Sequence, residues 1–327
     1  MARMSCLAGK RVLVTGGAGF VGSHIVDRLV SLGSDVTVYD NFSTGNKRFL
    51  EQSAGKIKTV AADVLDFADL AKSMRGADFV FHMAASADVK CNLDEPTKCL
   101  NQNTVATSNV LEAMRKNDVR GIAFASSGSV YGEPSVIPTP EDAPFPVQTS
   151  LYGASKVACE GMLQAYSAGY GLDVFIYRFV SQMGERYSHG CVFDFYRKLL
   201  ANPKSLEILG DGRQKKSYLY VKDCVEGILM SIAAAKEKMN VYNVGHDDYL
   251  EVTPIAEIVC ERLGLKNVRF RYTGGKRGWI GDSPFIHLDI TKLKSTGWKP
   301  TLSIPDCVRK TVDWLKENQW VLEERSG

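Results

Sequence analysis

Apolar residues recur along the chain in two alternating patterns, and these patterns predict most of its secondary structure. Short runs rich in β-branched and aromatic residues predict strands at residues 12–15, 35–39, 57–61, 78–82, 121–126 and 173–178. Apolar spacings of three and four residues predict a helix that begins at Phe20, and helices over residues 66–74, 96–116, 150–169, 252–263 and 304–318. Strands that alternate with helices at this pace are typical of an α/β fold with a doubly wound parallel sheet, in which ligands lie at the carboxyl ends of the strands.

A glycine-rich turn joins the first predicted strand to the first predicted helix. Gly16, Gly19 and Gly22 have the spacing Gly-x-x-Gly-x-x-Gly. Gly16 permits the tight turn, Gly19 lets the backbone approach a ligand, and Gly22 lets the helix pack closely on the strand. The free N–H groups at the start of the helix would then bind a pyrophosphate. An ordinary tight turn is the alternative, but the flanking strand and helix favour a dinucleotide site.

Asp40 follows the second predicted strand and comes 18 residues after Gly22. An acid close to this position binds the ribose hydroxyls of adenosine in dinucleotide-binding folds. Its carboxylate would repel a 2′-phosphate, and no arginine follows it directly, so the sequence favours NAD over NADP. A solvated aspartate at a strand end is the alternative. The polar loop 41–45 comes next and could close over the adenosine.

Later strand ends also carry residues that suit a ligand. Asp63 could accept a hydrogen bond from an adenine amino group or cap the next helix, for which Asp66 is the better candidate. The small residues 84–87 leave room for a ligand close to the backbone. Asn103, on the predicted helix that follows, is either a ligand contact or an ordinary polar residue. The fifth strand leads directly into Ser127.

Tyr152 and Lys156 lie four residues apart on the predicted helix 150–169, so their side chains share one face. A free phenol has a pKa of about 10 and is a poor base at neutral pH. A nearby ammonium stabilises the phenolate and lowers that pKa. Tyr152 could therefore take a hydroxyl proton while NAD accepts a hydride from the same carbon, and Ser127 could hydrogen-bond that oxygen. The spacing alone is common by chance, but the dinucleotide turn and the serine-rich strand end make it a strong signal.

Composition narrows the class of protein. The 327 residues are 45% hydrophobic and 24% charged, with a net charge of +3 and scattered lysines and arginines, which argues against a nucleic-acid or membrane surface. No apolar run approaches the ~20 residues of a membrane helix, and the first ten residues lack the apolar core of a signal peptide. The eight cysteines contain no Cys-x-x-Cys pair, so we expect free thiols in a reducing cytoplasm. The five histidines are dispersed, so no metal site is expected, and His82 is interpreted as a packed strand residue.

Together these motifs resemble the extended short-chain dehydrogenase/reductases, in particular the NAD-dependent nucleotide-sugar epimerases of the UDP-glucose 4-epimerase type. The resemblance covers nearly the whole chain, and it implies that Ser127, Tyr152 and Lys156 are the catalytic residues. It implies NAD contacts from Gly16, Gly19, Phe20, Val21, Gly22, Asp40, Asn41, Ser43, Thr44, Gly45, Asp63, Val64, Ala84, Ala85, Asn103, Tyr152 and Lys156.

The resemblance also divides the chain. It implies an NAD-binding Rossmann domain over residues 1–180, to which residues 219–246 return, and a smaller α+β C-terminal lobe over residues 181–218 and 247–327 that binds the nucleotide sugar. It further implies a homodimer that pairs the predicted helices 96–116 and 150–169. The implied substrate contacts are Ser86, Ser127, Ser129, Ser181, Lys216 and Arg277.

The nucleotide and the sugar stay open at this point. Lys216 and Arg277 can neutralise phosphate charge, although solvated basic loops would be the safer interpretation without the resemblance. Ser181 stands where the family often has asparagine, and Lys216 stands where it usually has arginine, whose bidentate fork lysine lacks. UDP is the default nucleotide, with GDP, CDP and dTDP as alternatives.

The residues after Ser127 distinguish between reactions of this group. Related 4,6-dehydratases carry an Asp-Glu pair where this chain has Gly128-Ser129, and related UDP-glucuronate decarboxylases have glutamate where Ser129 stands. An epimerase needs no additional acid, because it oxidises C4, lets the 4-keto sugar turn over and returns the hydride to the other face. The neutral pair favours 4-epimerisation. A dehydratase or decarboxylase that uses another carboxylate such as Glu133, a 4-dehydrogenase, and a non-catalytic NAD-sensing protein are the alternatives.

Overall fold

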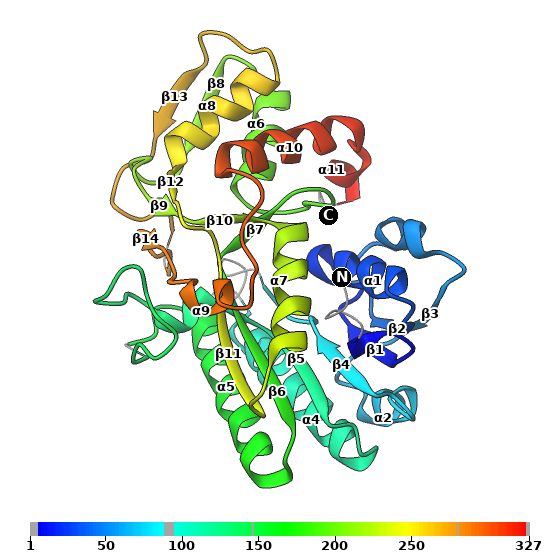
Figure 1. Ribbon diagram of the computed structural model, residues 1–327. Coiled ribbons are helices and arrows are strands. Elements are labelled where there is room, and N and C mark those ends of the chain that lie inside the picture. The colour runs from blue at the N-terminus through cyan, green and yellow to red at the C-terminus, as the bar shows by residue number, and fades with distance from the viewer. Residues whose placement is uncertain (1–5, 88–94, 146, 280, 325–327) are drawn as a thin grey trace.

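The computed structural model describes residues 6–87, 95–145, 147–279 and 281–324, so Cys91 and Ile280 lie outside the described residues (Figure 1). A seven-stranded parallel sheet forms its centre, with the order β11-β6-β5-β4-β1-β2-β3. This confirms the predicted α/β fold. The strands are β1 (Arg11–Thr15), β2 (Asp35–Asp40), β3 (Ile57–Ala61), β4 (Phe79–His82), β5 (Gly121–Ser127), β6 (Asp173–Phe179) and β11 (Met239–Val244).

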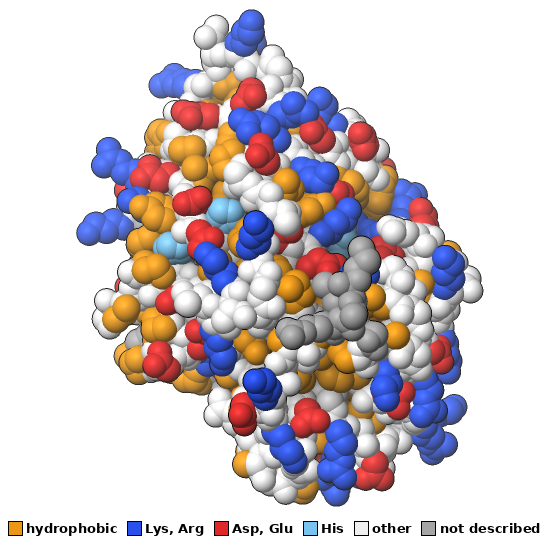
Figure 2. All heavy atoms as spheres, viewed as in Figure 1, with side chains coloured by type: hydrophobic (Ala, Val, Ile, Leu, Met, Phe, Trp, Pro, Cys, Tyr) orange, Lys and Arg blue, Asp and Glu red, His pale blue; other side chains and the backbone are white. Residues whose placement is uncertain are grey.

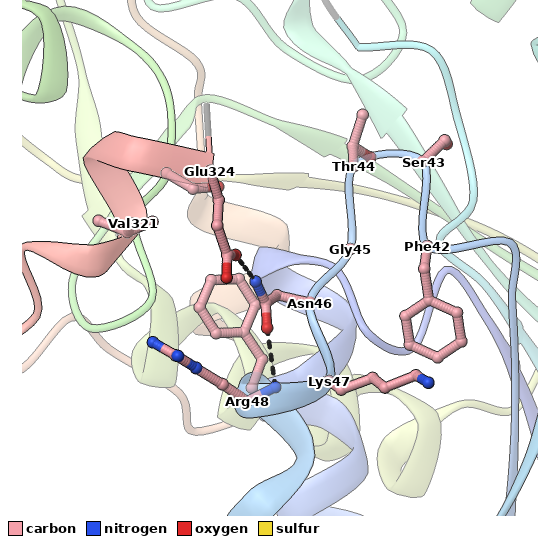
Figure 3. Close-up of a pocket in the computed structure, with 11 residues that line it drawn as sticks. Phe42, Ser43, Thr44, Gly45, Asn46, Lys47, Arg48, Val321 and Glu324 are labelled. Atoms are coloured by element: carbon pink, nitrogen blue, oxygen red, sulfur yellow. Dashed lines mark hydrogen bonds between the residues drawn. The ribbon is translucent and has the colours of Figure 1, made fainter. Parts of the chain in front are cut away.

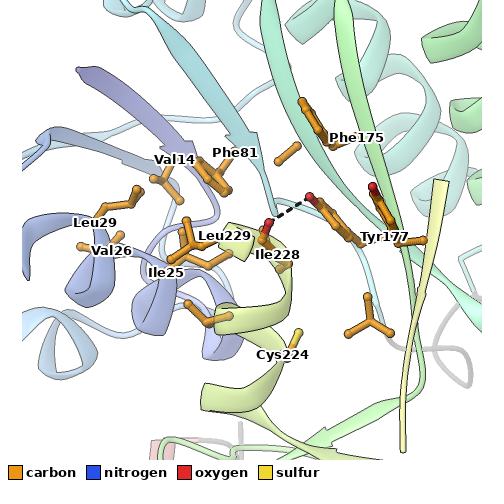
Figure 4. Packing of buried hydrophobic residues seen from close by; sticks show 14 of the residues in the cluster. Val14, Ile25, Val26, Leu29, Phe81, Phe175, Tyr177, Cys224, Ile228 and Leu229 are labelled. Atoms are coloured by element: carbon orange, nitrogen blue, oxygen red, sulfur yellow. Dashed lines mark hydrogen bonds between the residues drawn. The ribbon is translucent and has the colours of Figure 1, made fainter. Parts of the chain in front are cut away.

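Helices cover both faces of the sheet because successive strand residues point to opposite sides. Val12 and Val14 pack in one buried cluster with α1 and α7, whereas Leu13 packs in another with α2, α4 and α5. Figure 4 shows the first cluster, in which side chains of α1 and α7 meet Phe81 and Tyr177 of the sheet. The helices are α1 (Phe20–Ser31), α2 (Phe67–Ser73), α4 (Ala106–Lys116), α5 (Leu151–Tyr170) and α7 (Val221–Ala234).

The predicted helix 96–116 is not a single α-helix. It consists of α3 (Pro96–Cys99), a π-helical segment, η4 (Leu100–Val105), and α4. Wider turns of this kind are frequent at functional sites. Here the π-helical turn carries Asn103, which is buried and hydrogen-bonded to Ser86 and Ser155.

The C-terminal part of the chain builds a second lobe, which occupies the upper part of Figure 1. The predicted helices 252–263 and 304–318 are confirmed as α8 and α10, and both pack in a hydrophobic cluster of this lobe. No helix within the described residues is long and apolar enough to span a membrane. The remaining helices are α6 (Cys191–Ala201), α8 (Val252–Arg262), α9 (Thr291–Lys294), α10 (Ile304–Glu317) and α11 (Trp320–Glu324).

Three small sheets complete this lobe. One pairs β7 with β10, one pairs β8 with β13, and the third has the order β12-β9-β14. On the face shown in Figure 2, basic and acidic side chains are interspersed rather than gathered into one patch. The strands are β7 (Ser181–Met183), β8 (Ser205–Ile208), β9 (Lys215–Lys216), β10 (Tyr218–Tyr220), β12 (Leu250–Glu251), β13 (Arg269–Tyr272) and β14 (Phe285–Ile286).

Acidification should destabilise the fold through His82, which is buried at the end of β4 between the hydroxyls of Thr15 (2.8 Å) and Thr107 (3.1 Å). Burial, and secondarily the charge of Lys156, lower its pKa to about 3. Because this value lies below the unfolded one of about 6.5, the contribution of His82 is complete above pH 6.5 and is lost as the pH falls toward 3. Urea denaturation should show a shallower loss of stability in this range for His82→Gln, whereas exposed His189→Gln should keep the wild-type slope. Identical slopes in all three proteins would refute this expectation.

Candidate active site

The glycine turn is packed too closely for larger side chains at Gly16 and Gly22. Gly16 has a φ of +66°, and a Cβ there would lie 2.5 Å from the backbone nitrogen of Ala84. A Cβ on Gly22 would lie 2.1 Å from the carbonyl oxygen of Gly16. Gly19 is the N-cap of α1, and no side chain among the described residues caps this end or places an acid in the first turn. The N–H groups and the positive dipole end of α1 are therefore available to an anion.

Asp40 ties the glycine turn to the loop that follows β2. Its buried carboxylate accepts hydrogen bonds from the backbone nitrogens of Ala18 (2.9 Å) and Phe42 (2.8 Å). Burial raises the pKa of Asp40, and these two backbone hydrogen bonds oppose the rise. The carboxylate thus lies at the carboxyl end of β2, directly beside the glycine turn.

Asp63 lies at the end of β3 and pairs with the same loop. Its carboxylate accepts hydrogen bonds from Asn41 Nδ2 (2.7 Å) and from the backbone nitrogen of Leu65 (2.8 Å). Asp66 caps α2, as the sequence predicts, by accepting a hydrogen bond from the backbone nitrogen of Asp69. Asp63 therefore lies beside the loop 41–45, and its contact with adenine stays a prediction.

The predicted residues after β4 are held by Asn103. Its side chain accepts a hydrogen bond from the backbone nitrogen of Ser86 (2.8 Å) and donates to Ser155 Oγ (2.9 Å). Asn103 therefore fastens the segment that follows Ala84 and Ala85 to the helix α5. This positioning contact is what the structure assigns to Asn103, and a direct ligand contact stays a prediction.

The structure brings Ser127, Tyr152 and Lys156 together between β5 and α5. Ser127 ends β5, and its hydroxyl accepts a hydrogen bond from the backbone nitrogen of Ser129 (3.1 Å). The phenol of Tyr152 lies near enough to the side chain of Ser127 for this hydroxyl to favour the ionised phenol. Lys156 is buried, donates to the carbonyl oxygen of Ala125 (2.7 Å), and its Nζ lies 5.9 Å from the ring centroid of Tyr152.

The pKa of Tyr152 corrects one expectation. The residue is only partly buried as a whole, yet burial of its phenol raises the pKa to about 12, and the nearby hydroxyl of Ser127 only partly opposes this. Lys156 does not reverse the rise, because its ammonium is bound to the carbonyl of Ala125 and faces the ring of Phe124 at 4.6 Å. Burial also lowers the pKa of Lys156 itself. The prediction that Lys156 lowers the pKa of Tyr152 is therefore wrong for the chain alone.

A buried ion pair between α5 and β6 lies next to the residues of the Ser-Tyr-Lys set. Glu160 lies one turn after Lys156 on α5 and pairs with Arg178 of β6 at 2.7 Å, with both side chains at most 4% exposed. Glu160 also accepts a hydrogen bond from Ser126 (2.5 Å), and Arg178 donates to the hydroxyl of Tyr131 (2.6 Å). The sequence analysis missed this network, although a glutamate four residues after Lys156 and an arginine inside an apolar strand are its visible signals.

Glu160→Gln should lower the free energy of unfolding by about 3 kcal/mol, because it leaves the charge of Arg178 buried and unpaired. Urea denaturation would measure the loss. Glu112→Gln is the matched control, since Glu112 pairs with Arg115 on the surface of α4 at 2.6 Å, and exposed pairs contribute about 1 kcal/mol or less. Equal losses in the two variants would contradict the assigned role of Glu160.

The two predicted phosphate ligands meet around Asp282, which the sequence analysis did not select. The buried carboxylate of Asp282 pairs with Lys216 and accepts a hydrogen bond from the backbone nitrogen of Gly278 (2.9 Å). Arg277 donates to the carbonyl oxygen of Asp282 (3.1 Å) and pairs with Glu133. Asp282 lies 66 residues from Lys216, so no local pattern indicates this contact.

The cluster of Lys216, Arg277 and Asp282 lies close to the segment that follows Ser127. Arg277 pairs with Glu133, and Ser283 Oγ donates to the carbonyl oxygen of Gly132 (3.3 Å). The remaining predicted substrate residue, Ser181, is exposed at the start of β7. Among the residues that the structure describes, no group of three or more histidine, cysteine or acidic side chains is placed to hold a metal ion.

A model of the "NAD dependent epimerase/dehydratase family" matches residues 12–245, which include the glycine turn, Asp40 and the Ser-Tyr-Lys set. The chain belongs to this family. Its relatives include a putative UDP-glucose 4-epimerase of Methanocaldococcus jannaschii, which is 35% identical over 94% of this chain and 99% of that protein. A UDP-N-acetyl-alpha-D-glucosaminuronate decarboxylase of Bacillus cytotoxicus is 31% identical over 94% of this chain and 98% of that one.

Solved structures give the same picture of the family. A crystal structure of UDP-galactose 4-epimerase is 40% identical and superimposes with a TM-score of 0.86, covering 95% of this chain and 100% of that one. The protein is therefore an enzyme of the nucleotide-sugar epimerase, dehydratase and decarboxylase superfamily, with NAD as its cofactor. Because its relatives include both epimerases and decarboxylases, family membership leaves the reaction itself open.

The residues present fit NAD. The turn packs its backbone so closely that a Cβ on Gly16 or Gly22 would collide with it, and no side chain of the described residues caps the start of α1, so this turn would hold the pyrophosphate. Asp40 uses each carboxylate oxygen for one backbone hydrogen bond. Further lone pairs on the same oxygens would hold the ribose hydroxyls of the adenosine.

Proposed function

We propose that this family member is a nucleotide-sugar 4-epimerase. The observation that carries the proposal is the absence of an acid directly after Ser127, where Gly128 and Ser129 stand instead. Elimination of water or loss of CO₂ calls for an additional group to move protons, whereas epimerisation returns the same hydride to the other face. The short segment Gly128–Tyr131 presents only neutral side chains beside Ser127.

The nearest alternative acid in the sequence is already engaged, because the carboxylate of Glu133 is paired with Arg277. This argues against a dehydratase or decarboxylase in which Glu133 replaces the missing acid. The Ser-Tyr-Lys set is complete, and its three residues lie together between β5 and α5, which argues against a non-catalytic NAD-sensing protein.

Each residue of the set has a distinct task in this proposal. NAD held at the glycine turn and Asp40 would supply a positively charged nicotinamide ring as the acceptor and donor of the C4 hydride. Tyr152 takes the proton of the C4 hydroxyl and gives it back, and Ser127 hydrogen-bonds the same oxygen. Lys156 is held beside the ring of Tyr152 by its hydrogen bond to the carbonyl of Ala125. Lys216 and Arg277, held together by Asp282, would face the diphosphate, with UDP as the default nucleotide.

Product analysis tests the proposal. Holoenzyme incubated with UDP-glucose, UDP-glucuronate and their N-acetyl relatives should convert one of them into its C4 epimer without net NADH. Net loss of water or CO₂ would reject the proposal in favour of a dehydratase or a decarboxylase. A 4-keto product with accumulating NADH would indicate a 4-dehydrogenase.

A homodimer that pairs the predicted helices 96–116 and 150–169, the second of which is α5, is also part of the proposal. Large apolar side chains are exposed on the two predicted interface helices, namely Leu100 (52%), Val105 (39%), Leu151 (43%) and Tyr170 (50%). Exposed apolar side chains on both of these helices suit an interface with a second copy of the chain. Sedimentation equilibrium should give twice the mass of the chain, and Leu100→Glu should give the monomer, whereas exposed Tyr272→Glu should not.

The free thiols of the described residues suit a reducing compartment such as the cytoplasm.

A further inference from the structure

A cavity of about 470 Å³ lies between the loop after β2 and the C-terminal helix α11. Its lining includes residues 42–49 on one side, and Val321 and Glu324 on the other (Figure 3). The loop 41–46 contains the predicted ribose contacts and has no regular secondary structure of its own. Its conformation therefore depends on what holds it from either side.

The glycine turn holds this loop from one side. The backbone nitrogen of Asn46 donates to the carbonyl oxygen of Ala18 (2.9 Å), and a Cβ on Gly45 would lie 3.0 Å from the same residue. Asp40 accepts hydrogen bonds from both Ala18 and Phe42. Phe42 has a φ of +57°, a conformation that a bulky residue adopts only when its surroundings impose it.

The helix α11 holds the loop from the other side. Glu324 accepts a hydrogen bond from Asn46 Nδ2, while Asn46 Oδ1 accepts from the backbone nitrogen of Arg48 (2.8 Å), as Figure 3 shows. The guanidinium of Arg48 lies 4.5 Å from the ring centroid of Trp320. Asn46 therefore uses both ends of its amide, one to start the helix η2 (Lys47–Ser53) and one to reach α11.

Phe49 extends this contact into the core of the second lobe. Its side chain is 2% exposed and lies 5.9 Å from Trp320 and 6.2 Å from Trp314, centroid to centroid. It belongs to the hydrophobic cluster that α8 and α10 build, not to the clusters that flank the large sheet. The segment directly after the loop is thus anchored in the C-terminal lobe.

From these contacts we infer that α11 positions the loop 41–46 for NAD, with Trp320 and Glu324 as positioning residues. Neither side chain needs to touch the cofactor. They restrict the loop to the conformation in which Asp40, the glycine turn and residues 43–45 converge, so that less ordering is required when NAD binds. The retention of NAD by this enzyme therefore depends on its C-terminal helix.

The release of NAD from the purified holoenzyme tests this inference without any sugar nucleotide, so its outcome is independent of the proposed reaction. Trp320→Ala should release NAD about tenfold faster, and Glu324→Ala about threefold faster. Trp320→Phe should retain most of the wild-type behaviour, because it keeps an aromatic face for Arg48 and Phe49. Glu323→Ala is the matched control, since Glu323 is an exposed acid of the same helix outside the cavity lining.

A double-mutant cycle separates positioning of the loop from general loosening of the lobe. Arg48→Ala and Trp320→Ala remove the same contact, so the double variant should release NAD no faster than Trp320→Ala alone. Fully additive effects would overturn the inference, because they would mean that Trp320 acts elsewhere. Release at the Glu323→Ala rate by both Trp320→Ala and Glu324→Ala would overturn it as well.

Discussion

Replacing Tyr152 with phenylalanine should lower kcat by about a thousandfold or more while leaving NAD bound. The substitution removes only the hydroxyl beside Ser127, and no other phenol or imidazole is assigned to the C4 oxygen. The ring itself stays, so the packing around Lys156, whose Nζ lies 5.9 Å from its centroid, is preserved. Initial rates with the substrate identified by product analysis, together with the NAD content of the purified variant, provide the measurement.

Tyr166→Phe is the matched control for this substitution. Tyr166 lies on the same helix α5 and also donates a hydrogen bond, to Glu112 at 3.1 Å, but it faces α4 rather than Ser127. Its variant should keep kcat within about twofold of the wild-type value, since surface substitutions away from special features have small effects. A Tyr152→Phe variant as active as Tyr166→Phe would exclude Tyr152 as the acid–base group.

The pKa of Tyr152 shows where prediction from the sequence stops. The four-residue spacing correctly placed Tyr152 and Lys156 on one helix face, because this follows from helical geometry alone. It could not indicate where the ammonium points, which depends on the carbonyl of Ala125 on a neighbouring strand. Since burial raises the pKa to about 12, the chain alone does not supply the charge that a base at neutral pH requires.

The fold was predictable for a related reason. Both faces of the central strand β1 are covered, and its residues Val12, Leu13 and Val14 are accordingly all apolar. A continuous apolar run of this kind can be recognised from the sequence alone. The π-helical turn was not predicted, and the partners of its residue Asn103, Ser86 and Ser155, lie 17 and 52 residues away, so that no local pattern indicates them. The boundaries of the two domains stay a prediction.

The residues of the candidate site likewise separate into those that the sequence indicated and those that it missed. Gly16, Asp40 and Ser127 were identified because each ends a strand, and the carboxyl ends of parallel strands meet at one edge of the sheet. Glu160 and Asp282 were missed because their function lies in pairing with Arg178 and Lys216, and an ion pair between distant segments leaves no periodic signal. Positions fixed by topology could therefore be read from the sequence, whereas positions fixed by long-range pairing could not.

Gly22→Ala should abolish stable NAD binding. The added Cβ would lie 2.1 Å from the carbonyl oxygen of Gly16 and 3.0 Å from the Cα of Gly17, and neither atom can move without displacing the turn. Because the turn places the start of α1 against the pyrophosphate, even a shift of about 1 Å should raise the NAD dissociation constant by a hundredfold or more. Calorimetric titration of NAD into the protein, with circular dichroism to verify the fold, would measure this effect.

Gly169→Ala is the control that separates this clash from the general effect of an added methyl group. Gly169 lies in α5, and a Cβ there would meet no atom within 4 Å. Alanine at an exposed helical position stabilises a helix by about 1 kcal/mol relative to glycine, so this variant should bind NAD like the wild type and unfold at the same or a higher temperature. If Gly22→Ala also retained wild-type affinity, the pyrophosphate would not lie at the glycine turn, and the placement of NAD along the edge of the sheet would have to be abandoned.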